Sequence, residues 1–179
     1  MDQAARIDAF KTLLAPPGLP ELGPGPRPGV LTSKELDDAL KPLLVGSSVP
    51  PASRDVVRGL LLLWHDHFEP AHAIAQDIAS ADGSLLHAIL HRREPDYSNA
   101  AYWFRRVGRH GSFPALGARV SARLESKGES ALAGRLAPGG EWEPFAFIRL
   151  CERSNADDAQ LLREIQGVET EVLLEYWLG

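Results

Sequence analysis

The chain has a single cysteine, Cys151, among its 179 residues. One cysteine excludes an internal disulfide, and the first residues lack the charged segment and apolar run that mark a secretory signal. The longest uninterrupted apolar run, residues 59–64, is far shorter than the roughly 20 residues that a membrane-spanning helix needs. These absences predict a soluble, cytoplasmic protein with no membrane partner.

The sequence also lacks the pattern of β-strands. Nowhere do four or more residues alternate between apolar and polar with enrichment in β-branched side chains. Apolar residues recur instead at helical spacing, and polar capping residues, prolines and glycines separate the helical segments. We therefore expect an all-α fold, a single-domain helical bundle over residues 31–179.

Residues 1–30 form a distinct N-terminal region. Residues 3–14 place Ile7, Phe10, Leu13 and Leu14 at helical spacing, which predicts a short amphipathic helix that docks on the bundle or on a partner. Residues 15–29 contain six prolines and four glycines, a composition that prevents regular structure. We expect this segment to be an extended linker or a wrapping arm.

Within the bundle, Thr32 and Glu35 have the spacing of a capping box, which predicts a helix that ends near Leu44. Ser53 is expected to cap a long helix over residues 54–78, with a kink near Glu69 because a proline follows at position 70. Further helices are expected over residues 83–93 (capped by Asp82), 98–107 (capped by Ser98), 114–126, 129–136, 144–153 and 155–178, the last bent or divided at Gly167.

Charge is distributed unevenly along the chain. The net charge of −5 makes nucleic acid an unlikely partner, because polyanions are bound by basic surfaces. Residues 84–140 carry nine Lys or Arg against four acidic residues, whereas residues 141–179 carry three against nine. The two regions could pair within one monomer or across a homodimer, and both arrangements agree with the sequence.

All six histidines lie between His65 and His110, and five of them fall in the stretch that ends at His91. Imidazole can ligate a metal and also changes charge near neutral pH. The short turn at residues 80–82 favours an antiparallel pair of helices, which sets His72 opposite His91. His87 and His91 are four residues apart and therefore share one stripe of their helix.

This geometry predicts a divalent metal site with His72, His87 and His91 as ligands. Glu69 or His65 would complete the coordination shell or act as a catalytic base. Imidazole and carboxylate ligands suit zinc, iron, manganese or nickel and do not choose among them. Two metal-free alternatives stay open: a buried polar network that only fixes a unique core, and acid–base chemistry without an ion.

A cluster of arginines and aromatic residues follows directly in the segment HRREPDYSNAAYWFRRVGRH. Arginine beside aromatic rings can hold anionic groups, so we expect Arg92, Arg93 and Arg106, with Tyr102, to bind a small anionic ligand. The alternative is that these arginines pair with acidic residues and the aromatic rings belong to the core.

Together, the two clusters predict a metal-binding protein that could act as a metal-dependent enzyme on a small anionic substrate. The competing class is a non-catalytic interaction or structural module in which the histidine and arginine network is internal.

Two resemblances accompany these residues. Arg105 and His110 resemble the Arg-x4-His motif of the HEPN ribonucleases, an all-helical family, which implies metal-free RNA cleavage as a distant alternative. The stretch from Leu63 to Arg109, with WHDHFEPAHAIAQDI and DGSLLHAILHRREPDYSNAAYWFRRVG, is similar to a family of uncharacterised bacterial and fungal proteins that share this histidine- and arginine-rich block. That second resemblance implies no activity, substrate or cofactor.

Overall fold

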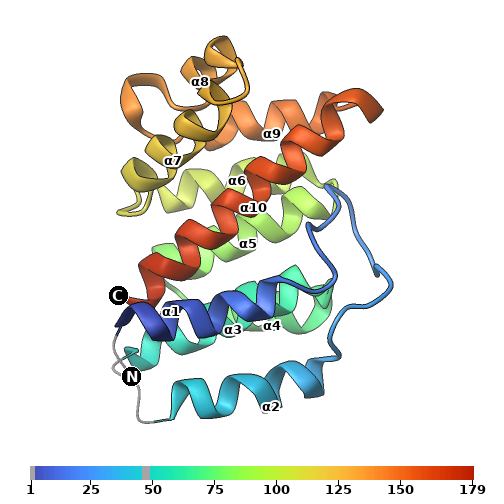
Figure 1. Cartoon of the computed structure of the whole chain (residues 1–179), viewed down its shortest axis with the longest axis vertical. Helices are drawn as coiled ribbons and strands as arrows, with labels where there is room; N and C mark the ends of the chain where they lie inside the picture. The colour runs from blue at the N-terminus through green and yellow to red at the C-terminus, as the bar shows by residue number, and fades with distance from the viewer. Residues whose placement is uncertain (1–2, 46–48) are drawn as a thin grey trace.

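The computed structural model describes residues 3–45 and 49–179, which fold into ten α-helices and two 3₁₀ turns without any strand. The all-α prediction is confirmed (Figure 1). The elements are α1 (Gln3–Lys11), η1 (Thr12–Leu14), α2 (Ser33–Leu44), α3 (Pro51–Trp64), α4 (Phe68–Asp77), α5 (Ala81–Arg93), α6 (Tyr97–Val107), α7 (Phe113–Glu125), α8 (Ser130–Leu136), η2 (Pro138–Gly140), α9 (Pro144–Arg153) and α10 (Ala156–Leu178). No described helix combines the length and apolar content needed to cross a membrane.

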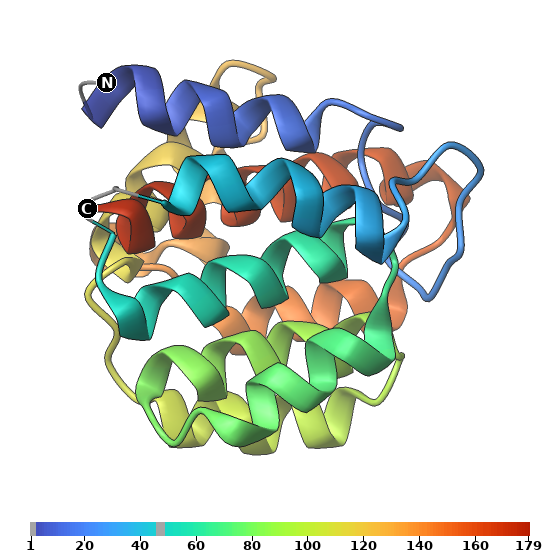
Figure 2. The ribbon, with the colours of Figure 1, turned by 90° about the horizontal axis from the view of Figure 1, so that it is seen from below.

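The helices are arranged around α3, α5 and α10. The long helix α10 runs diagonally across the molecule, with α7, α8 and α9 at one end and α1 to α4 at the other (Figure 1). Viewed from below, α1 and α2 lie on one side and α4, α5 and α6 on the opposite side (Figure 2). Helix α5 packs most extensively against α6 and is buried from Gly83 to Arg93. The polar residues of α5 are therefore held inside the protein, where each needs a partner.

Helix starts follow local capping chemistry, although several caps differ from the prediction. The capping box of Thr32 and Glu35 is confirmed, since each residue's side chain accepts a hydrogen bond from the other's backbone N–H. Three predicted caps are wrong: the N-caps are Pro50 in place of Ser53, Ser80 in place of Asp82, and Asp96 in place of Ser98. Asp82 lies inside the first turn of α5, and its carboxylate accepts hydrogen bonds from His110 and Trp177.

The predicted long helix over residues 54–78 is two helices. The chain leaves helical geometry at His65 and returns at Phe68, and Asp66 between them has a φ of 64°. Aspartate tolerates this left-handed conformation better than most residues. Pro70 lies in the first turn of α4, where its missing N–H costs nothing because those N–H groups have no intrahelical acceptor. The proline therefore helps to start a helix and does not kink one.

The N-terminal segment wraps on the bundle. Phe10 is completely buried and Leu14 nearly so. Within the irregular segment, the carbonyls of Leu19 and Pro20 accept hydrogen bonds from Arg163 on α10. Residues 15–29 are thus a wrapping arm, one of the two roles expected for them.

Gly167 explains how the arm comes so close to α10. Contrary to the expected bend, α10 is continuous through this residue. A Cβ atom at position 167 would lie 2.6 Å from Cδ2 of Leu19. The glycine therefore lets the side chain of Leu19 lie directly against α10 and does not mark a break in the helix.

The two regions of opposite charge pair with each other within one chain. On α10, Glu164 pairs with Arg123 and Lys127, and Glu175 pairs with Arg119. The most buried pair is Arg92 with Glu169, in which both guanidinium NH groups donate to the carboxylate at 2.9 and 2.5 Å. This pairing ties α5 to α10.

Candidate metal centre

Three histidines from two helices converge on one point. His72 lies on α4, and His87 and His91 lie on α5. One ligand nitrogen from each imidazole lies within 4.8 Å of the other two. The closest pair is Nε2 of His72 and Nε2 of His87, at 2.8 Å. The antiparallel arrangement expected from the short turn therefore brings these three side chains together.

Aromatic stacking fixes the orientation of the rings. The imidazole of His87 stacks on Trp103, with ring centroids 4.0 Å apart and an interplanar angle of 16°. The same imidazole is also parallel to that of His91, at 4.9 Å. His72 meets both rings edge-on, at interplanar angles of 85° and 78°. Two parallel rings on α5 thus face one perpendicular ring on α4, and the packing restricts their rotation without any ion.

The protonation state of His87 suits metal binding. His87 and His91 are only 3% and 8% exposed, whereas His72 is half-buried. Burial, together with the neighbouring His72 and His91, lowers the pKa of His87 to about 4. His87 is therefore neutral at pH 7, and a metal ion binds the neutral form of imidazole.

Some buried nitrogens of the cluster lack hydrogen bonds. Nδ1 of His87 and Nδ1 of His91 are both buried without one. Nδ1 of His91 lies 2.9 Å from a carboxylate oxygen of Glu94, but the pair lacks hydrogen-bond geometry. The other ring nitrogen of His91 lies 3.2 Å from the side-chain amide of Asn99. Buried polar groups are almost always paired, so Nδ1 of His87 is an exception, whereas Nδ1 of His91 has the carboxylate of Glu94 beside it.

The residues fit a transition-metal ion. Bonds of about 2.0–2.1 Å in tetrahedral geometry separate two ligand nitrogens by about 3.3 Å. His72 and His87 would therefore move apart by about half an ångström when an ion enters. No carboxylate joins the three imidazoles in this group within the described ranges. The site thus offers three protein ligands.

An open pocket of about 380 Å³ lies beside His72. Its lining residues are Glu69, His72, Ala73, Gln76 and Glu94. Glu69 precedes His72 by one turn of α4, and Glu94 follows the last turn of α5. Of the three histidines, His72 is the one that lines this pocket.

His65 lies elsewhere, although the sequence suggested it as a ligand or base. It is completely buried, with Nε2 2.8 Å from the carbonyl of Leu13 and Nδ1 accepting from the backbone N–H of Leu31 at 3.2 Å. Burial lowers its pKa, and the hydrogen bond with Leu13 opposes this shift. Both ring nitrogens therefore anchor the N-terminal region. His67 has a similar role, since its Nε2 lies 2.7 Å from the carbonyl of Leu31.

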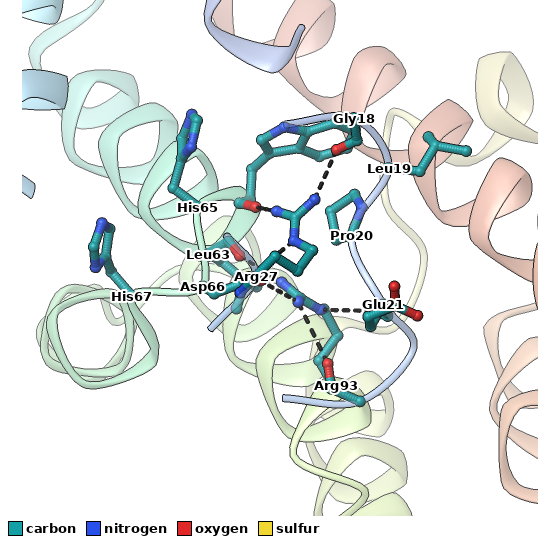
Figure 3. Close-up of polar contacts among 12 residues, drawn as sticks. Gly18, Leu19, Pro20, Glu21, Arg27, Leu63, His65, Asp66, His67 and Arg93 are labelled. Atoms are coloured by element: carbon teal, nitrogen blue, oxygen red, sulfur yellow. Dashed lines mark hydrogen bonds and ion pairs between the residues drawn. The ribbon is translucent and has the colours of Figure 1, made fainter. Parts of the chain in front are cut away.

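Arg92 and Arg93 are both buried, and neither presents its guanidinium to the pocket. Arg92 is bonded to Glu169, and Arg93 donates to Asp66 at 2.7 Å and to the carbonyl of Leu63. Asp66 also accepts hydrogen bonds from Arg27 of the arm (Figure 3). We therefore assign Arg92 and Arg93 to structural contacts. These buried contacts agree with the alternative in which the arginine network is internal.

No pattern in the sequence predicted the cluster of Arg27, Asp66 and Arg93. Burial alone would raise the pKa of Asp66, but the hydrogen bonds from Arg27 and Arg93 outweigh it and hold the pKa below its usual value. The negative end of α3 adds to this site, because carbonyls of its last turn accept from both arginines. The sequence signal that could have been used was an aspartate two residues after the end of an apolar helix.

Arg106 and Tyr102 lie on the exposed side of α6. The guanidinium of Arg106 lies over the ring of Trp103, 5.3 Å from its centroid. Tyr102 is 48% exposed and meets Trp103 edge-on. Trp103 thus stands between Arg106 and His87. Neither Arg106 nor Tyr102 lines the pocket beside His72.

The Arg-x4-His pair finds no support as a joint site. Arg105 is exposed on α6, whereas His110 is buried beyond Gly108, which ends that helix with a φ of 62°. The ring nitrogens of His110 are bonded to Ser112 at 2.7 Å and to Asp82 at 2.9 Å. His110 therefore connects α5 to the loop before α7.

Comparisons of the chain with protein-family models, curated proteins and solved structures gave no match. The function is therefore inferred from the geometry of the site.

Proposed function

We propose that the protein binds one divalent transition-metal ion through His72, His87 and His91. The observation that carries the proposal is the convergence of three ligand nitrogens within 4.8 Å. Three imidazoles with an open fourth position are typical of catalytic metal sites, whereas structural zinc sites are closed by four protein ligands. Zinc, iron, manganese and nickel all suit these ligands.

The cost of packing three imidazoles together supports the same conclusion. Burial beside two other imidazoles lowers the pKa of His87 to about 4. His87 therefore stays neutral at pH 7, which is the form of imidazole that binds a metal ion. Nε2 of His72 and Nε2 of His87 lie 2.8 Å apart. A metal ion between them would replace the hydrogen bond that these two nitrogens otherwise share, and it would use their lone pairs.

Elemental analysis of protein purified without an affinity tag tests the proposal. We expect about one equivalent of a transition metal per chain, or uptake of one equivalent of zinc by chelator-treated protein. His91→Ala should lose this metal. The matched control is His67→Ala, because His67 lies outside the triad and its Nε2 contacts a backbone carbonyl.

Two outcomes would contradict the proposal. One is a wild-type protein that neither contains a metal nor takes up zinc, nickel, manganese or iron. The other is a His67→Ala variant that loses metal as completely as His91→Ala while both remain folded by circular dichroism.

A second candidate function is hydrolysis by a metal-bound water. Glu69 favours it, because this carboxylate lines the open pocket together with His72. A carboxylate beside a metal-bound water can act as a general base, which contributes about 10²–10⁴-fold to rate. Zinc-loaded protein should hydrolyse p-nitrophenyl acetate faster than metal-free protein, and Glu69→Gln should lose most of this rate while it retains zinc. Equal rates with and without zinc would exclude this function.

A further inference from the structure

We infer that Trp103 of α6 is a positioning residue of the metal centre, which holds the imidazole of His87 in the orientation that brings its Nε2 to the ion. This inference rests on the proposed metal centre, because Trp103 acts through one of the three ligands. It adds a third helix to a site whose ligands all come from α4 and α5.

Helix α6 lies along the histidines of α5. His87 and His91 are one turn apart on α5, and α5 packs more extensively against α6 than against any other element. Asn99 and Trp103 are likewise one turn apart on α6. The amide of Asn99 lies 3.2 Å from Nε2 of His91, and the indole of Trp103 covers the imidazole of His87. Each histidine of α5 therefore has its own partner on α6.

His87 depends on this partner more than His91 does. The ring of a metal-bound histidine is usually fixed by its second nitrogen, which donates to a carboxylate or a carbonyl. His91 has a carboxylate in this place, since Glu94 lies 2.9 Å from its Nδ1. In the described residues, Nδ1 of His87 is buried without a hydrogen-bond partner. The nearly parallel indole of Trp103, with its centroid 4.0 Å away, therefore takes over the role of fixing the ring.

The indole is itself held by its neighbours. The guanidinium of Arg106 lies over the indole, 5.3 Å from its centroid, and Tyr102 meets it edge-on at 5.5 Å. The two residues that the sequence suggested for an anionic ligand thus support Trp103. A ligand whose neighbours are fixed by packing keeps its orientation before the ion arrives. His87 is therefore preorganised for the metal through Trp103.

The zinc affinity of Trp103 variants tests the inference. Trp103→Leu removes the flat ring, and we expect about tenfold weaker zinc binding or more, since loss of an outer-shell partner typically costs about 10–100-fold. Trp103→Phe keeps a ring that can stack on His87 and should retain most of the affinity. The control is Phe145→Leu, because Phe145 is a half-buried ring that packs on the same helix through Phe104. This control should bind zinc as the wild type does.

The visible spectrum of cobalt-loaded protein separates positioning from a purely structural role, because it responds to ligand geometry and not to stability. Trp103→Leu should alter the spectrum, whereas Trp103→Phe should keep it. If Trp103→Leu does not fold, quenching of tryptophan fluorescence by bound nickel provides the test. Nickel should quench part of the wild-type emission, and Trp103→Phe should lose that quenched part.

The outcomes separate this inference from the metal centre itself. Wild-type zinc affinity in Trp103→Leu, or an equal loss in Phe145→Leu, overturns the positioning role and leaves the metal centre standing. Equal fractional quenching by nickel in the wild type and in Trp103→Phe also overturns it. Wild-type protein that takes up no zinc, cobalt or nickel overturns the metal centre and with it this inference. Metal content and circular dichroism are therefore measured on the same samples.

Discussion

The imidazole of His87 is packed against Trp103 and two other imidazoles, and this position determines its response to pH. Its pKa is about 4 in the folded protein, against about 6.5 for an unperturbed histidine in the unfolded chain. The unfolded chain therefore takes up a proton more readily between these two values. The contribution of His87 to the free energy of unfolding is fully present above pH 6.5 and is lost as the pH falls towards 4.

We predict that metal-free protein becomes less stable as the pH falls from 7 to 4.5, by up to about 3 kcal/mol from His87, since one pKa unit corresponds to about 1.4 kcal/mol. His87→Phe keeps an aromatic ring against Trp103 but cannot be protonated, so its stability should depend less on pH. Urea unfolding in the presence of a chelator measures this difference. Identical pH dependence of the two proteins would show that His87 is not the titrating group.

Asp66 is the second residue whose buried neighbours determine how much it contributes to stability. Its side chain is completely buried between Arg27 and Arg93. Removal of one partner from a buried ion pair leaves an uncompensated charge and typically costs about 3–5 kcal/mol. We predict a loss of this size for Asp66→Asn, since asparagine also tolerates the left-handed backbone and removes only the charge.

Asp38→Asn is the control for Asp66→Asn. Asp38 pairs with Lys34 on the surface of α2, with 67% of its side chain exposed, and such pairs contribute little. Urea unfolding should show a change of less than about 0.5 kcal/mol for this variant. Similar losses of unfolding free energy in both variants would mean that the buried cluster stabilises the fold no more than a surface ion pair does.

At the level of elements, most helices could be predicted because their ends depend on local signals, although the predicted helix over residues 54–78 is two helices. The capping box of Thr32 and Glu35 is made entirely of neighbouring groups. The placement of His72 against α5 could also be predicted, because two helices joined by a short turn pack antiparallel to each other. Pairing of Arg92 with an acidic residue was one expected alternative, but the identity of its partner could not be predicted. Its partner Glu169 is 77 residues away, and no local pattern identifies a contact at that distance.

The role of Gly167 also could not be predicted from local sequence, because it depends on a contact with the distant N-terminal arm. We predict that Gly167→Leu costs about 1–3 kcal/mol by overpacking against Leu19 and speeds proteolysis within residues 15–29. Gly134→Leu in α8 is the control, because a Cβ atom there meets nothing within 4 Å. This control should be neutral or slightly stabilised, since glycine disfavours helices. Limited proteolysis with equal cleavage in both variants would contradict a close approach of the arm to α10.

At the level of the whole molecule, the arm and the histidine triad lie at different sites. The arm is anchored by Arg27 at the end of α3 and by Arg163 on α10. The triad lies between α4 and α5, on the side of the molecule away from α1 (Figure 2). The single cysteine, Cys151, is buried, and it belongs to no group of possible metal ligands in the described part of the chain. The proposed metal centre therefore depends on the imidazoles of His72, His87 and His91.

Zinc K-edge X-ray absorption of the zinc-loaded protein tests this claim most directly. We predict a first shell of nitrogen and oxygen at about 2.0–2.1 Å, with the multiple scattering of three imidazoles and no sulfur. In His72→Ala the imidazole count should fall and the affinity for zinc should drop. A spectrum with a sulfur ligand, or with at most one imidazole, would contradict a metal centre built from His72, His87 and His91.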